Sequence, residues 1–104
     1  MISDEQIEAR LDEKGLNEPR ITIAHIESKI VREDYHVFEG TTVTVCALHM
    51  ENGYVVTGES AAVSPGNFDA ELGRQIAKQQ AMDKIWALEG YVLRERIYQG
   101  NLTE

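Results

Sequence analysis

Hydrophobic positions divide this chain into extended and helical parts. Residues 34–38 and 42–50 are rich in aromatic and β-branched residues, which predicts two strands, and a third strand follows Asn52-Gly53. Further on, apolar residues recur at steps of three and four, which predicts one long amphipathic helix. Its predicted buried stripe is Leu72, Ile76, Ala77, Ala81, Ile85, Leu88 and Val92. We therefore predict an α+β fold: N-terminal helices, a three-stranded antiparallel sheet, and a long C-terminal helix packed on one sheet face.

The dipeptide Asn52-Gly53 favours a two-residue type I′ turn, which would pair Glu51 with Tyr54 and set the hairpin register. In that register one sheet face is small in its middle, so we expect the long helix to lie across it. This face would hold Val43, Val45, Ala47, His49, Val56, Gly58, Ser60 and Ala62. The opposite face would hold Thr44, Cys46, Leu48, Met50, Val55, Thr57, Glu59 and Ala61. A second apolar stripe on the helix consists of Met82, Trp86 and Leu93.

Helix-end signals stand at four places. Ser3 and Gln6 form a capping box, and Gly15 would stop the first helix. Thr22 would cap a short second helix, and Asn67 would cap the long one. The second helix would place three isoleucines along one side: Ile23, Ile26 and Ile30.

The length and the charge distribution predict one folded domain with an acidic N-terminal extension. A chain of 104 residues supports a single core. We assign residues 1–20 to an acidic helix and linker, 21–98 to the α+β domain and 99–104 to a tail. Residues 1–39 carry ten acidic and five basic side chains, so most of the net charge of −8 lies there. This sign opposes nucleic-acid binding, which depends on basic surfaces.

Several classes of protein are not expected. No apolar run reaches the roughly 18 residues of a membrane span, and the N-terminus lacks the order of a signal peptide, which favours the cytoplasm. One cysteine and three scattered histidines give no zinc spacing, so we expect no metal and no cofactor. His36, Ser60 and Asp69 could be drawn as a triad, but no nucleophile elbow supports it. We therefore predict no catalytic residues and assign Cys46 to the core.

Five residues are candidates for ligand binding. Glu59 lies in mid-strand between Gly58 and Ser60, where a carboxylate must be exposed, paired with a base, or in contact with a ligand. Tyr35 and His36 offer stacking and hydrogen-bonding groups on an edge strand. Arg74 and Lys78, one helical turn apart, could reach an anion across a subunit junction. More apolar surface is present than three strands cover, which favours a homo-oligomer.

Five segments closely resemble one family of small tailed-phage proteins. They are YHVF at 35–38, GTTVTVC at 40–46, GESA at 58–61, NFDAELGR at 67–74 and KIWALEGY at 84–91. The family is named for the gene 49 product of the N-four phage and the gene 66 product of the Sf-six phage. The likeness spans about residues 21–96. It implies a phage or prophage protein made in a bacterial cytoplasm, and it brings no catalytic residues.

The order of elements is also similar to that of the double-stranded RNA-binding domain. GES at 58–60 and IAKQQA at 76–81 lie where that fold has its glycine-rich strand end and its alanine-rich helix. The lysine cluster that binds RNA is replaced by Asn67, Asp69 and Glu71. The likeness therefore supports the topology and argues against the activity.

Three classes of function remain open from the sequence. The first is a homo-oligomeric, non-catalytic binding protein that acts on a host protein or sequesters a small nucleotide-like signal. The second is a nucleic-acid binder on the RNA-binding-like topology. The third is an enzyme, which would gain support if Glu59 and a histidine converged in one cleft.

Overall fold

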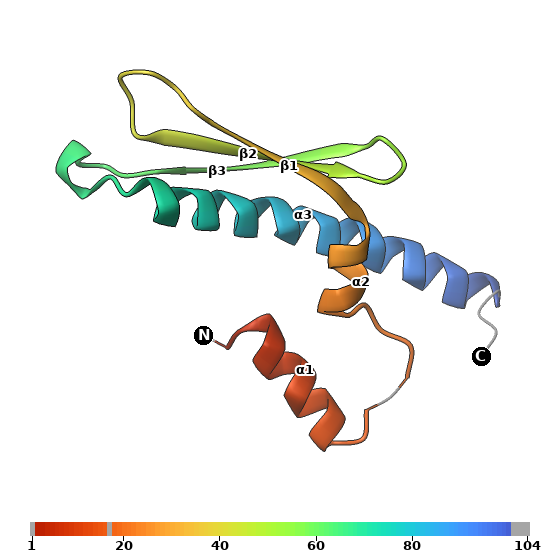
Figure 1. Cartoon of the computed structure of the whole chain (residues 1–104). Helices are drawn as coiled ribbons and strands as arrows, with labels where there is room; N and C mark the ends of the chain where they lie inside the picture. The colour runs from red at the N-terminus through yellow and green to blue at the C-terminus, as the bar shows by residue number, and fades with distance from the viewer. Residues whose placement is uncertain (1, 17, 101–104) are drawn as a thin grey trace.

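The computed structural model describes residues 2–16 and 18–100. Two helices come first, α1 (Asp4–Glu13) and α2 (Ile23–Ser28), followed by three strands. The strands β1 (Ile30–Val37), β2 (Val43–Met50) and β3 (Val55–Ala61) form an antiparallel sheet in the order β1-β2-β3. A short 3-10 helix (Pro65–Asn67) leads into α3 (Ala70–Gln99). The helices α1, α2 and α3 lie on one side of the sheet, with α3 running along it (Figure 1). The predicted α+β architecture is thus confirmed.

Local signals at the first two helices are confirmed in atomic detail. Ser3 and Gln6 form the capping box, with hydrogen bonds of 3.1 and 2.8 Å. Gly15 follows the last turn with a φ of 67°, a conformation that favours glycine. Thr22 Oγ1 accepts a hydrogen bond from the His25 amide at 3.1 Å. The extension of the second helix to Ile30 is wrong, because that residue begins β1.

The hairpin register is the main correction to the sequence analysis. Tyr54 pairs with Met50 and not with Glu51 as predicted, because the hairpin loop holds three residues instead of two. Its last residue, Gly53, has a φ of 92°, which fits a type I turn followed by a bulge glycine. The extra loop residue shifts β2 by one position, and a one-residue shift moves every side chain to the other face. Val45 therefore pairs with Glu59, and Cys46 pairs with Gly58.

The corrected register assigns new residues to the two faces. The face under α3 holds Thr44, Cys46, Leu48, Met50, Val56, Gly58 and Ser60. The opposite face of β2, predicted to be covered, consists of Val43, Val45, Ala47 and His49, and each of these is half-buried. The prediction for β3 is confirmed, since Gly58 and Ser60 do face the helix. We call the uncovered side of the sheet the open face.

A close helix–sheet approach determines the core. A Cβ built on Gly58 would lie far inside 3.0 Å of the Ala77 carbonyl oxygen and 2.5 Å from the Ala81 amide nitrogen. Only small residues on α3 permit this contact. Ala77 and Ala81 are accordingly fully buried. Ile85, one turn beyond Ala81, is also fully buried, and Met82 and Trp86 of the second stripe pack against this core.

The rest of the predicted stripe on the long helix is wrong. Leu72 and Ile76 are 52% and 49% exposed, and Leu88 and Val92 are both 41% exposed. A helix in such close contact buries the narrow row of small residues, so the larger apolar residues beside that row remain at the surface.

The long helix and the first strand also begin and end at other residues than predicted. Asp69, not Asn67, caps α3, and its carboxylate accepts a 3.0 Å hydrogen bond from the Leu72 amide. Strand β1 begins four residues before Asp34 and ends one residue before Phe38. The helix extends to Gln99, into the segment assigned as a tail, and residues 101–104 of that segment lie outside the described residues.

Candidate functional site

Four of the five candidate residues divide between the two sides of the sheet, and the fifth, Arg74, is an exposed residue of α3. Tyr35 pairs with Cys46 and so shares the covered face with the core, on the side of α3 that carries Lys78. His36 pairs with Val45, and Val45 pairs with Glu59 on its other side, so these three form one row across the open face. The structure therefore brings together two separate groups and not one site.

The group on the covered side is centred on Glu33. The Tyr35 hydroxyl donates to its carboxylate at 2.9 Å, and the Lys78 ammonium donates at 2.8 Å. The hydrogen bond from Lys78 lowers the pKa of Glu33 below its usual value. Burial and the bond to Glu33 raise the pKa of Tyr35 above its usual value. Lys78 thus neutralises a carboxylate at the margin of the core.

Cys46 lies at the covered end of this group and is fully buried. Burial raises the pKa of its thiol, so the nucleophilic thiolate is disfavoured. The assignment of Cys46 to the core is confirmed.

The open face carries a second polar group where β1 and β2 pair next to the hairpin loop. The His49 ring lies 2.8 Å from the Asp34 carboxylate, and Arg32 forms an ion pair with the same oxygen at 3.0 Å. The hydrogen bond from His49 lowers the pKa of Asp34 below its usual value. A histidine–carboxylate pair is therefore exposed beside apolar strand residues.

The neighbouring Glu59 has an exposed side chain. Its backbone amide donates to Gln80 Oε1 on α3 at 2.7 Å, which fixes this part of β3 against the helix. Within residues 2–16 and 18–100 its carboxylate has no ion-pair partner. The structure thus shows Glu59 exposed, which was one of the three alternatives, and does not show it paired with a base.

The arrangement does not assemble a hydrolytic triad. Ser60 Oγ donates to the Gly73 carbonyl at 2.7 Å on the covered side, whereas His36 lies on the open face. Asp69 is occupied as the cap of α3. Glu59 and His36 share the open face but flank Val45, so two strand spacings, roughly 10 Å, separate their backbones.

A groove that the sequence analysis missed lies between the hairpin tip and the C-terminal half of α3. Its volume is about 680 Å³, and most of its lining is apolar. The hairpin contributes Met50, Asn52, Tyr54 and Val56, and the helix contributes Lys84, Ala87, Leu88, Glu89, Tyr91 and Val92. The sequence signal for this groove was the excess of apolar residues late in α3. The wrong hairpin register hid which residues of the hairpin lie opposite them.

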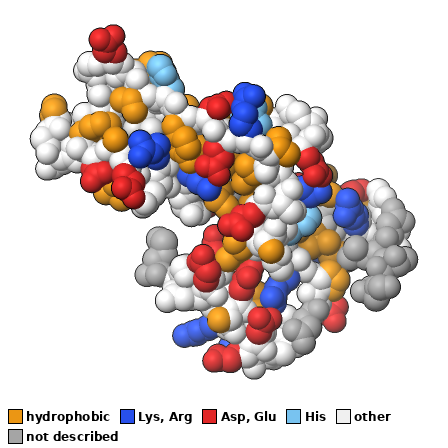
Figure 2. Space-filling view, viewed as in Figure 1, with side chains coloured by type: hydrophobic (Ala, Val, Ile, Leu, Met, Phe, Trp, Pro, Cys, Tyr) orange, Lys and Arg blue, Asp and Glu red, His pale blue; other side chains and the backbone are white. Residues whose placement is uncertain are grey.

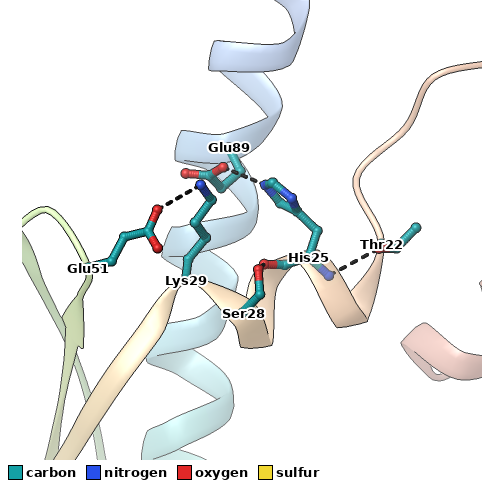
Figure 3. A network of polar contacts seen from close by, with 6 residues as sticks. All are labelled: Thr22, His25, Ser28, Lys29, Glu51 and Glu89. Carbon is teal, nitrogen blue, oxygen red and sulfur yellow. Dashed lines mark hydrogen bonds and ion pairs between the residues drawn. The ribbon is translucent and has the colours of Figure 1, made fainter. Parts of the chain in front are cut away.

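A polar network fastens the flank of this groove (Figure 3). His25 on α2 contacts the Glu89 carboxylate of α3 at 2.7 Å. Lys29, at the end of α2, forms a 3.0 Å ion pair with Glu51 in the hairpin loop. The Glu51 amide also donates to the Lys29 carbonyl at 2.9 Å. Helix α2 thereby ties the hairpin tip to the second half of α3.

The charge on the surface is uneven. Figure 2 shows carboxylates gathered over α1, in the lower part of the view. Among the described residues, no group of three or more histidine, cysteine or acidic side chains is placed to hold a metal ion. Within the same residues, no helix combines the length and the apolar character that crossing a membrane requires.

Fold and surface together define a two-layer α+β protein with one open sheet face. The chain belongs to the phage protein (N4 Gp49/phage Sf6 gene 66) family, whose model matches residues 21–97. The match covers the sheet, α2 and nearly all of α3 and leaves α1 outside, as the sequence motifs indicated. Neither a curated protein nor a solved structure matches the chain. The family description names a phage origin and no reaction.

Proposed function

We propose that this protein is a non-catalytic binding protein that self-associates and captures a host protein through the open face of its sheet, in the cytoplasm of the infected bacterium. The observation that carries this proposal is that, in the part of the chain that the structure describes, no helix covers the second face of the three-stranded sheet (Figure 1). Two-layer folds hide one sheet face, and the other must face water or a partner.

The composition of the open face supports a partner more than water. Strand β2 places Val43, Val45 and Ala47 there, and β3 adds Val55, which is 41% exposed. Polar groups surround this apolar row, with His36 at one side and Glu59 at the other. An apolar centre with a polar rim is the usual anatomy of a protein–protein interface.

Charge narrows the class of partner. The net charge of −8 repels nucleic acid and attracts basic protein surfaces, where it speeds the encounter. The RNA-binding-like topology places acidic residues where phosphate contacts would be needed, since Asp69 caps the long helix and Glu71 lies in its first turn. By its overall charge the chain therefore suits a basic surface of a host protein better than RNA.

A small nucleotide-like ligand is the second candidate. It would need Arg74 and Lys78 at a subunit junction, where both cations could meet a phosphate. Lys78 is already engaged by Glu33 at 2.8 Å, whereas Arg74 has no ion-pair partner among the residues that the structure describes. Binding of a nucleotide-like ligand would therefore depend on Arg74 alone, and we rank it below capture of a protein.

Native mass spectrometry of the protein isolated from infected cells tests the proposal. We expect multiples of the 11.7 kDa chain that carry a bound host polypeptide. An added mass below about 1 kDa would instead support the nucleotide-like ligand. A bare chain with neither addition would contradict both versions.

A matched pair of variants locates the binding surface. Val45→Lys places a charge at the centre of the open face and should remove the host polypeptide from the spectrum. Val63→Lys makes the same change at a fully exposed position after β3 and should leave the complex intact. Loss of the host polypeptide from both variants, or from neither, would exclude the open face as the binding surface.

A further inference from the structure

The second half of α3 carries a stripe that no other described helix or strand covers, although its half-buried Glu95 accepts a 2.7 Å hydrogen bond from Gln99 of the same helix. Its members follow one another at steps of four, three, four and three, which is the spacing of a helix–helix seam. We call this stripe the α3 seam; it consists of Lys84, Leu88, Tyr91, Glu95 and Tyr98. Tyr91 and Tyr98 are 73% and 81% exposed. Such large exposed aromatic residues on a soluble helix mark an interaction surface.

We propose that a second copy of this chain covers the α3 seam, with the two α3 helices antiparallel about a two-fold axis between residues 89 and 90. This inference rests on the self-association part of the proposed function and names the surface that carries it. A two-fold interface must be complementary to itself, so the charges of the seam decide whether the pairing works.

The charge order of the seam satisfies this condition in one direction only. In the antiparallel register Leu88 of one copy faces Tyr91 of the other, twice, and forms the apolar centre. Lys84 of one copy then faces Glu95 of the other, also twice, at the two ends of that centre. A parallel pair would instead place lysine against lysine and glutamate against glutamate, which is repulsive. The sequence of charges therefore selects the antiparallel pair.

The groove beside the seam accepts the aromatic side chains that this pairing brings. Met50, Tyr54 and Val56 form its hairpin wall, and Leu88 and Val92 form its helix wall. A tyrosine from the second copy can bury its ring there while its hydroxyl stays at the rim.

The charges around the groove are also arranged for such a partner. Of the two charged residues that line it, Glu89 is engaged by His25 at 2.7 Å. Lys84 has no ion-pair partner within the described part of the chain. The unpaired charge at the rim is therefore a lysine, which matches the glutamate that the second copy presents.

Charge reversal tests the pairing on the full-length protein. Light scattering after size-exclusion chromatography, run over a dilution series, gives the fraction of particles at twice 11.7 kDa. Lys84→Glu or Glu95→Lys alone replaces two attractive contacts by two repulsive ones and should raise the dissociation constant at least about tenfold. The double variant restores opposite charges and should recover the affinity to within about threefold of the wild type.

Two further variants keep the result interpretable. Leu88→Glu should leave single chains at the concentrations where the wild type pairs. Ile76→Glu changes a residue of the same helix that lies outside the seam and is 49% exposed, against 41% for Leu88, and it should have no effect. Circular dichroism confirms that each variant retains its helix.

The outcomes separate this inference from the proposed function. Ile7 is an exposed apolar residue of α1 and offers an alternative contact for a second copy. A dimer that is unaffected by all seam variants, or is broken only by Ile7→Glu, would overturn the α3 pairing and leave capture of a host protein standing. A wild type that remains a single chain at all concentrations would overturn both the pairing and the self-association from which it follows.

Discussion

Replacing Gly58 by alanine is the most direct perturbation of the helix–sheet contact. Gly58 lies under α3, and an added Cβ would meet the backbone of Ala77 and Ala81 at distances below 3.0 Å. Neither contact can be relieved by turning a flexible side chain, because both involve main-chain atoms of a helix. The helix must therefore lift away from the sheet, and Ile85 loses part of its burial with it.

The expected cost follows from two opposing effects. Overpacking a well-filled core costs about 1–3 kcal/mol, and a backbone clash belongs at the upper end of that range. Alanine is better than glycine in a strand by roughly 0.5–1 kcal/mol, which offsets part of the loss. We expect a net destabilisation of about 2–2.5 kcal/mol. For a chain of this size that lowers the Tm by roughly 10–20 °C.

Thermal unfolding followed by circular dichroism measures this change, with Gly90→Ala as the matched control. Gly90 lies inside α3 with no atom within 4 Å of an added Cβ, so its replacement should stabilise the protein by about 1 kcal/mol. If Gly58→Ala unfolds within a degree or two of the wild type, the close approach of α3 to β3 is wrong.

Four other expectations follow from the same structure. Ile85→Ala should cost about 3 kcal/mol in urea unfolding while Leu72→Ala costs under about 0.5 kcal/mol, and equal losses would contradict the observed core. Asp69→Ala should cost about 1 kcal/mol by removing the α3 cap, and no loss would refute its capping role. Because the pKa of Glu33 is lowered in the folded protein, its ion pair adds stability above the unfolded pKa that is lost as the pH falls through the folded value. Lys78→Met should therefore reduce the difference in stability between about pH 7 and about pH 3, and an unchanged difference would show that the pair is not formed. A gel shift with double-stranded RNA or DNA at low salt should show no complex, and a shift that weakens with added salt would revive the nucleic-acid alternative.

Sequence patterns predicted the order of the elements because each one has strong local determinants. The capping box at Ser3, the cap at Thr22 and the hairpin glycine at Gly53 all act within a few residues. The alternation in the strands and the periodicity of the long helix act over one element each. Local physics of this kind requires no knowledge of the tertiary partner.

The register failed because Asn52-Gly53 fits two loop lengths. Glycine with positive φ serves a two-residue turn and also the bulge position of a three-residue loop. Strand β2 cannot distinguish them, because apolar residues such as Val45 and Leu48 occur on both of its faces. Only the pairing across the sheet decides, and that information is not local.

The buried stripe of α3 failed for a related reason. Periodicity assigned Leu72 and Ile76 to the core because they are large and apolar. The contact at Gly58 is so close that small residues such as Ala77 are selected over larger ones. The candidate residues Tyr35 and Lys78 likewise meet only through Glu33, a long-range pairing that no local motif signals.

Hydrogen–deuterium exchange on the complex isolated from infected cells tests the central claim most directly. We expect the exposed amides of β1 and β3, the two edge strands of the sheet, to exchange more slowly in the complex than in the free protein. We expect little difference in exchange in α3. Protection confined to residues 84–98, with the strands exchanging as they do in the free protein, would contradict capture through the open face.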